Sequence, residues 1–178
     1  MNDRYGKASI FLHWFMLAQL AAVYACIELH SLFPDGSETY ELLETWHFML
    51  GLSVFLLVWV RIAARRAGGT PPITPAPAAW QDWSARIVHI ALYGLMIGMP
   101  IGGWLMLSAK GEPVPFFGLT LPPLTGPNEE LAELIEEIHE TAGVAGYWII
   151  GLHAAAALFH HYVQRDNTLS RMWRGSAR

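Results

Sequence analysis

The sequence predicts an all-α integral membrane protein, a four-helix bundle that crosses the bilayer. The first observation behind this prediction is composition. Hydrophobic residues make up 53% of the 178 residues and charged residues only 15%, and the mean hydropathy is +0.31. An average soluble domain is about 25% charged, so the chain has too few charges to cover a water-soluble globule.

The second observation is four long runs without Asp, Glu, Lys or Arg, at 10–27, 45–60, 87–109 and 141–164. A helix needs about 20 apolar residues to cross the bilayer core. The second run is short, but Arg61 at its end can extend its side chain to the interface. We therefore predict one four-span domain over residues 1–178, with spans at approximately 9–30, 44–64, 84–109 and 138–164.

The basic residues predict the orientation of these spans. If four spans alternate, ten basic residues lie on one side: Arg4, Lys7, Arg61, Arg65, Arg66, Arg86, Arg165, Arg171, Arg174 and Arg178. Only Lys110 lies on the other side. Basic residues favour the cytoplasmic side, so we expect both termini in the cytoplasm and the acidic loops 30–44 and 110–138 outside. In a bacterial inner membrane, the outside would be the periplasm.

Other features of the chain narrow its class. Cys26 is the only cysteine, which excludes a disulfide scaffold. The net charge of -4 argues against a nucleic-acid partner. The proline-rich segment 70–77 predicts an extended connector without helix. The segment 111–128 also carries apolar residues, so we expect it to fold back over the bundle.

Histidines are the most informative residues, because ionisable side chains inside a bilayer are costly and usually functional. Seven of the eight lie in or at the ends of the predicted spans: His13, His47, His89, His139, His153, His160 and His161. Any single one could instead donate a hydrogen bond to a neighbouring helix. Their depths favour a shared function.

Four of these histidines form two pairs at matching depths. His139 and His153 are 14 residues apart, which places them about 21 Å apart on nearly the same helix face. His47 is level with His139 at the outer side, and His13 is level with His153 at the inner side. Two facing imidazoles suit six-coordinate haem iron, whereas zinc needs a third or fourth ligand. We therefore predict two haems between the helices.

Other residues in these spans fit the same interpretation. Arg61 lies 14 residues after His47, at the depth of the inner pair, where it could pair with a haem propionate or anchor the helix at the interface. Gly143 and Gly146 lie between His139 and His153. They either leave room for a flat macrocycle or allow close helix packing.

Several motifs make the chain similar to a known family: "LHW" in 6–14, "TPPI" at 70–73, "FGLTLP" at 117–122, "HET" at 139–141, "IGLHAAAALFHHY" at 150–162 and "DNTLSRM" at 166–172. Over essentially its whole length the chain resembles the bacterial di-haem cytochrome b561 family. This four-helix inner-membrane family is related to the cytochrome b subunits of formate dehydrogenase and nickel–iron hydrogenase.

The resemblance implies two haem b groups, with His13 and His153 on the inner haem and His47 and His139 on the outer haem. It leaves His89 and His160 near the inner haem, where the family binds quinone, and His160 is the better candidate for that contact. The alternative for His160 is an interfacial histidine that only faces water. The members that look most similar are superoxide oxidases, which pass electrons from superoxide to ubiquinone.

The outer face is acidic, whereas an enzyme that captures an anion is favoured by a basic surface around its entry point. Nine glutamates lie there: Glu38, Glu41, Glu44, Glu129, Glu130, Glu133, Glu136, Glu137 and Glu140. Lys110 is then the expected entry point for superoxide. An acidic face suits a basic protein donor, so the competing hypothesis is an electron relay or anchor for a periplasmic dehydrogenase or a c-type cytochrome. A transporter with a histidine relay is a third class, in which the paired depths have no purpose.

Overall fold

The computed structural model describes residues 4–173 and contains four helices that are long and apolar enough to cross a membrane. They are α1 (Lys7–His30), α2 (Glu38–Gly68), α3 (Ala79–Lys110) and α4 (Glu129–Phe159). A π-helical turn, η1 (His160–Gln164), continues α4, and a short 3₁₀ turn, η2 (Ser170–Met172), follows. The predicted four-helix membrane fold is confirmed. Arg174 and Arg178, which enter the charge argument, lie outside the described residues.

The helices α2 and α4 begin well before the predicted spans because polar first turns are stabilised there. Ser37 caps α2 by accepting a hydrogen bond from the backbone N–H of Tyr40 at 3.3 Å. Asn128 caps α4 in the same way, with the N–H of Leu131 at 3.0 Å. Acidic residues occupy both first turns, where their negative charges interact favourably with the positive end of the helix dipole.

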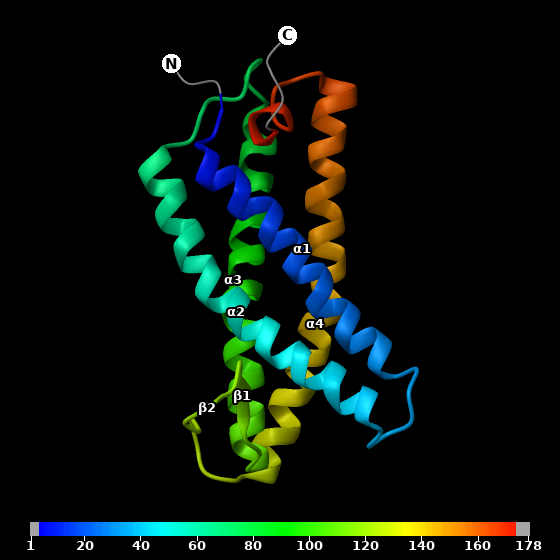
Figure 1. Cartoon of the computed structure of the whole chain (residues 1–178). Coiled ribbons are helices and arrows are strands. Elements are labelled where there is room, and N and C mark those ends of the chain that lie inside the picture. The colour runs from blue at the N-terminus through cyan, green and yellow to red at the C-terminus, as the bar shows by residue number, and fades with distance from the viewer. Residues whose placement is uncertain (1–3, 174–178) are drawn as a thin grey trace.

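The helices form an antiparallel bundle (Figure 1). Helix α1 packs on α2, α2 on α3, and α3 on α4. The start of α1 and the end of α4 lie at one end of the bundle, which is expected for an even number of spans. Helices α1 and α4 lie farther apart than the three pairs that pack directly on each other, so ring side chains such as those of His13 with His153 and Tyr24 with Tyr147 bridge them.

A small β-hairpin closes the opposite end of the bundle. Strands β1 (Val114–Phe116) and β2 (Leu119–Leu121) pair antiparallel. Their two-residue turn has positive φ angles, 46° at Phe117 and 84° at Gly118, as a tight hairpin turn requires. Val114 is 2% exposed and packs in a cluster with Leu52 and Leu107. The predicted fold-back of this loop is confirmed, although its strands were not predicted.

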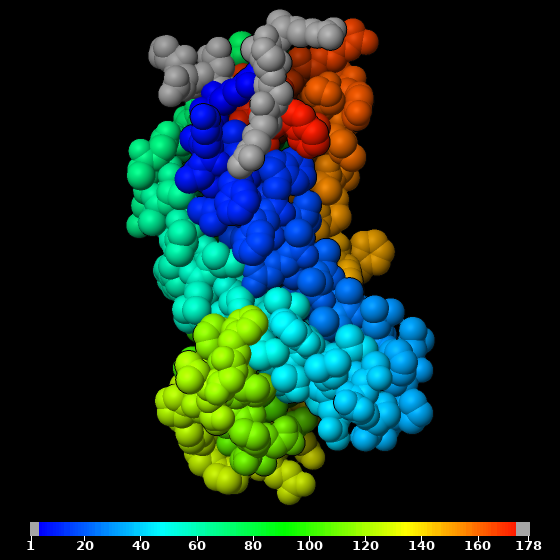
Figure 2. All heavy atoms as spheres, viewed as in Figure 1, coloured from blue at the N-terminus to red at the C-terminus, as the bar shows by residue number. Residues whose placement is uncertain are grey.

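Much of the helix surface is apolar and open. Helices α1 and α2 form a continuous face above the hairpin segment in Figure 2. Large side chains elsewhere remain exposed, including Trp80 at 69%, Ile90 at 71% and Trp148 at 78%. Such a surface is unfavourable in water and is expected of helices that face lipid. The segment 69–78 contains no helix, as the prolines predict.

Candidate functional site

The outer histidine pair joins α2 to α4. The ring centres of His47 and His139 lie 6.3 Å apart, with an angle of 69° between the ring planes. Nδ1 of His47 is 3.0 Å from the carbonyl oxygen of Val23. Because a carbonyl only accepts, Nδ1 carries the proton and Nε2 keeps its lone pair. His47 is therefore held in the tautomer that a metal ligand needs.

The ring of His139 differs from that of His47, because no hydrogen bond joins its side chain to the described residues. Its Nδ1 is buried and unpartnered. A buried polar atom normally has a partner, so this ring is unsatisfied by protein groups alone. Gly102 and Gly103 of α3 lie against it, and a Cβ at either position would lie 3.5 Å from the ring. These glycines let α3 approach the histidine closely.

The inner pair joins α1 to α4. The ring centres of His13 and His153 lie 6.2 Å apart, with an angle of 82° between the planes. His89 of α3 lies beside this pair, with its ring centre 5.3 Å from that of His153. The structure thus brings together the four paired histidines as the sequence predicts, and it places His89 at the inner end.

The two ring-centre separations agree with the distance expected when a metal is held between two imidazoles. Such a metal separates the ring centres by about 6.2 Å, because each metal–nitrogen bond is about 2.0 Å and each nitrogen lies about 1.1 Å from its ring centre. Among the described residues, no cluster of three or more His, Cys, Asp or Glu side chains could hold a metal ion. The donor sets therefore fit a group that supplies the remaining ligands itself, as the four porphyrin nitrogens of haem do.

Arg61 lies beside the inner pair. Its Nη1 is 3.5 Å from the carbonyl oxygen of Ser9. Its charge is close enough to act electrostatically on His13, His89 and His153. This placement agrees with the depth predicted for Arg61 and leaves its guanidinium available to a carboxylate at the inner site.

The glycines between His139 and His153 serve close packing. A Cβ at Gly146 would collide with the hydroxyl of Tyr24, and that hydroxyl donates to the carbonyl oxygen of Gly143 at 2.9 Å. The ring of Tyr24 also packs against that of Tyr147, with 4.3 Å between the ring centres and an angle of 42° between the planes. Of the two interpretations of these glycines, the structure favours helix packing.

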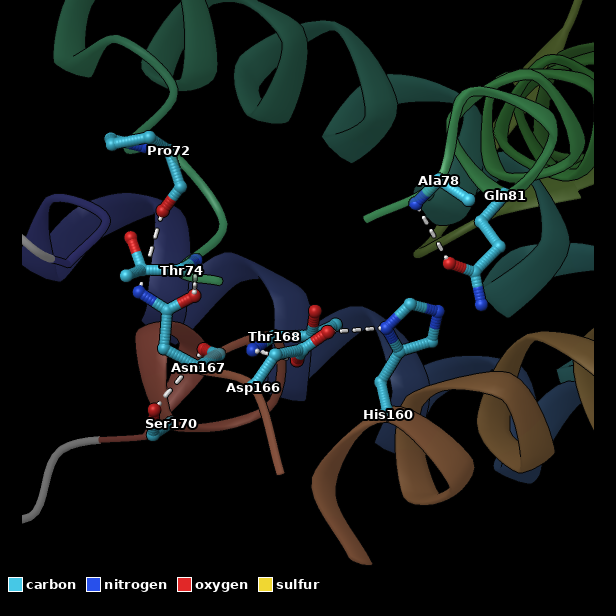
Figure 3. A network of polar contacts seen from close by, with 9 residues as sticks. All are labelled: Pro72, Thr74, Ala78, Gln81, His160, Asp166, Asn167, Thr168 and Ser170. Carbon is cyan, nitrogen blue, oxygen red and sulfur yellow. Dashed lines mark hydrogen bonds and ion pairs between the residues drawn. The ribbon is translucent and has the colours of Figure 1, made fainter. Parts of the chain in front are cut away.

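His160 lies at the inner end of α4, two turns beyond His153, and is bound to Asp166 (Figure 3). Its Nδ1 is 2.5 Å from Oδ2 of Asp166, and the two side chains are 15% and 1% exposed. Oδ1 of Asp166 accepts a hydrogen bond from the N–H of Thr168 at 2.8 Å. His160 therefore does not simply face water: its Nδ1 is held by a carboxylate, and its Nε2 makes no hydrogen bond within residues 4–173.

The charge state of Asp166 follows from these contacts. Burial by itself raises the pKa of the Asp166 carboxyl, but the hydrogen bonds from His160 and Thr168 outweigh it and leave the pKa below its ordinary value. Asp166 was not predicted as a site residue. The available signal was an acidic residue on a side of the membrane that is otherwise strongly basic, six residues after His160.

The segment around Asp166 joins distant parts of the inner end (Figure 3). Asn167 accepts from the N–H of Thr74 at 2.8 Å and so holds the proline-rich connector. Arg171 donates to the carbonyl oxygen of Pro71. Trp14 of α1 donates to the carbonyl oxygen of Met172 at 2.8 Å. This segment therefore fixes both the connector and α1 beside His160.

Lys110 lies at the outer end of α3, as predicted, but its charge is partnered. Its Nζ is 3.0 Å and 2.9 Å from the two carboxylate oxygens of Glu136. The two side chains are 32% and 42% exposed, so the pair remains accessible from water. The sequence did not predict this ion pair, which neutralises the expected entry point for an anion.

Comparison with known proteins agrees with this fold and site. Residues 4–175 match the family model described as prokaryotic cytochrome b561. "Cytochrome b561 homolog 1" of Escherichia coli (strain K12) is 41% identical over 170 residues, which cover 96% of this chain and 97% of the relative. "Probable superoxide oxidase CybB" of Yersinia pestis is 34% identical over 172 residues, which cover 97% of each chain. "Cytochrome b561 homolog 2" of Escherichia coli (strain K12) is 27% identical over 179 residues, which cover 96% and 91%.

A membrane-spanning four-helix bundle with facing histidines is the architecture of a b-type cytochrome that moves electrons across a membrane. The family match extends over nearly the whole chain. The protein belongs to the prokaryotic cytochrome b561 family, and the resemblance found in its motifs is confirmed. It is thus a multi-pass bacterial membrane protein of a family that binds haem b and carries out transmembrane electron transfer.

Proposed function

We propose that the protein holds two haem b groups, the inner one between His13 and His153 and the outer one between His47 and His139. The observation that carries this proposal is the pair of ring separations, 6.2 Å and 6.3 Å, both near the value for opposed imidazole ligands. When bound, haem iron supplies one-electron redox chemistry. The chain orients the ligands, through the His47–Val23 hydrogen bond and the packing of α3 glycines on His139.

We propose that the protein lies in the bacterial inner membrane as one domain over residues 1–178, with both termini in the cytoplasm. The basic residues of the inner end support this orientation. Arg61 would then pair with a propionate of the inner haem, because it lies beside His13 and His153 and is always charged.

The activity that we propose is superoxide:ubiquinone oxidoreductase. Two superoxide anions give two molecules of dioxygen and two electrons, which, with two protons, reduce ubiquinone to ubiquinol. This reaction is supported by the 34% identity between this chain and the relative named a probable superoxide oxidase. Lys110 is the proposed contact for superoxide at the outer end, and it would have to exchange Glu136 for the anion.

His160 is the proposed contact for the quinone. Since ionised Asp166 only accepts, Nδ1 of His160 carries a proton. When His160 is cationic, Nε2 carries a second proton and can donate it to a quinone oxygen during reduction. The buried carboxylate of Asp166 would hold the ring in place and balance its charge.

The second candidate function is a non-catalytic electron relay or anchor for a periplasmic dehydrogenase or a c-type cytochrome. The observation that favours it is the Lys110–Glu136 ion pair, which leaves the outer end strongly acidic and suited to a basic protein partner.

Stopped-flow mixing separates these functions. Purified haem-loaded protein is mixed with superoxide and a ubiquinone analogue, while haem reduction and ubiquinol formation are followed together. Rapid haem reduction together with rapid ubiquinol formation supports the superoxide oxidase activity. If superoxide leaves the haems oxidised while a basic c-type cytochrome reduces them rapidly, the relay is correct.

A further inference from the structure

A pocket of about 410 Å³ lies between the inner end of α2, the start of the connector that follows it, and Tyr93 of α3. Its lining comes from α2, α3 and the connector between them: Ile62, Arg65, Arg66, Gly69, Thr70 and Tyr93. None of these residues belongs to α1 or to α4, which carry the inner histidine pair. The connector runs at one end of the bundle (Figure 1), and Gly69 and Thr70 at its start place the pocket there.

The pocket is strongly cationic. Within residues 4–173, no carboxylate forms an ion pair with Arg65 or Arg66. Arg65 is also close enough to the guanidinium of Arg171 for the two like charges to repel. An anion bound by Arg65 and Arg66 would offset the repulsion that Arg171 exerts on Arg65. It would also form ion pairs with Arg65 and Arg66, which have none within the described residues.

The polarity of the pocket changes with depth. Arg66, Gly69 and Thr70 are exposed at its mouth. Ile62 and Tyr93 lie deeper along their helices, and Tyr93 packs against the buried cluster of Met16, Val54 and Val58. The hydroxyl of Tyr93 is nevertheless buried without a hydrogen-bond partner. The pocket thus combines cations at the membrane surface, an apolar wall below them and one unsatisfied donor.

This combination fits a molecule with an anionic head and an apolar body. We propose that the pocket binds the phosphate group of an anionic phospholipid, with Arg65 and Arg66 on the phosphate and the acyl chains running down past Ile62. Basic pockets between helices on the cytoplasmic side of a membrane are suited to such headgroups. The hydroxyl of Tyr93 donates to an ester or phosphate oxygen and is satisfied by the lipid.

The test is lipid retention by the haem-loaded full-length protein. The protein is incubated in mixed micelles with equal mole fractions of dioleoylphosphatidylglycerol and dioleoylphosphatidylcholine, and retained lipid is counted by native mass spectrometry. We expect the wild type to retain phosphatidylglycerol preferentially. The Arg65→Gln/Arg66→Gln double variant should lose about tenfold or more of that preference, and Tyr93→Phe about fivefold.

Arg86→Gln is the matched control, because it removes an exposed cation of α3 that does not line the pocket. It should retain lipid as the wild type does. If the double variant does not fold, the single Arg66→Gln change at the exposed mouth should still weaken retention. Equal loss in Arg86→Gln overturns the proposal, because charge alone then explains retention. Unchanged retention in the pocket variants also overturns it.

Two further outcomes test the source of the anion. If the double variant loses a haem while its lipid retention is unchanged, the arginines serve a haem propionate and the lipid site is wrong. If inorganic phosphate alone displaces phosphatidylglycerol as well as added phosphatidylglycerol does, the pocket recognises free phosphate and the lipid proposal fails.

Discussion

Replacing Asp166 with Asn is a direct test of the polar network at the inner end. The change keeps the shape of the side chain but removes its charge. Asp166 is 1% exposed in its side chain and accepts from His160 at 2.5 Å and from Thr168 at 2.8 Å. A hydrogen bond to a charged group contributes about 1.5–3 kcal/mol. For a chain of this size, that corresponds to a fall of roughly 3–12 °C in the thermal midpoint.

The assay is thermal unfolding of the haem-loaded protein in detergent, followed by loss of the haem spectrum. Asp35→Asn is the control, because Asp35 is an exposed acid in the loop between α1 and α2, and it should change the midpoint little. The Asp166→Asn variant should also reduce quinone more slowly, because the ring of His160 loses its fixed partner.

The dependence on pH has a definite sign. The pKa of Asp166 is lowered in the folded protein by its hydrogen bonds, against the opposing effect of burial. Its contribution to stability is therefore complete above the ordinary carboxyl pKa of about 3.9, and it is lost as the pH falls through the lower folded-state value. The difference between wild type and Asp166→Asn should be constant near neutral pH and shrink only in acid. Equal midpoints for the two proteins at neutral pH would refute the reasoning.

Substitutions at three other places, His160, the Lys110–Glu136 pair and Gly146, give distinct outcomes. His160→Ala should slow quinone reduction about a hundredfold, the lower end of the effect of a positioned proton donor, and leave both haem spectra intact; loss of the inner haem would instead make His160 a ligand. Lys110→Glu should lower the rate of haem reduction by superoxide at unchanged haem content, and Glu136→Gln should raise it by freeing Lys110. As ionic strength increases, the rate of haem reduction by superoxide should rise, or should fall only slightly, because salt screens the repulsion from the acidic face. A steep fall would instead indicate that basic residues attract superoxide to the outer end. Gly146→Ala should lower the free energy of unfolding by about 1–3 kcal/mol, because the added methyl group would collide with the Tyr24 hydroxyl, and the thermal midpoint should fall accordingly. Gly151→Ala is the control, because Gly151 has open space around it. Equal midpoints for the two variants would contradict the packing of Tyr24 on Gly146.

The fold could be predicted from the sequence because the bilayer imposes a simple rule. Uncharged runs of about 20 residues are helices, and the spacing between His139 and His153 sets their depth on a regular helix. The depths of the four histidines predict that His13 lies near His153 and that His47 lies near His139, and the ring centres of each pair are close together in the structure. The placement of Arg61 follows in the same way.

What the sequence did not predict depends on contacts between segments far apart in the chain. The hydrogen bond from His160 to Asp166 requires the chain to reverse after η1, and helical periodicity says nothing about such a reversal. The Lys110–Glu136 pair joins a helix end to a different helix across the outer loop. The short hairpin at 114–121 depends on two residues with positive φ, and a turn of two residues is a weak signal in a proline-rich loop.

The most direct test of the central proposal is the number of haems per chain in the wild type and in four variants. The pyridine haemochrome assay, referred to protein concentration, should give two haems for the wild type. It should give one haem for each of His13→Ala, His153→Ala, His47→Ala and His139→Ala, with the inner haem lost in the first two and the outer haem in the last two. One haem in the wild type, or loss of the same haem from variants of both pairs, would show that the assignment of the pairs is wrong.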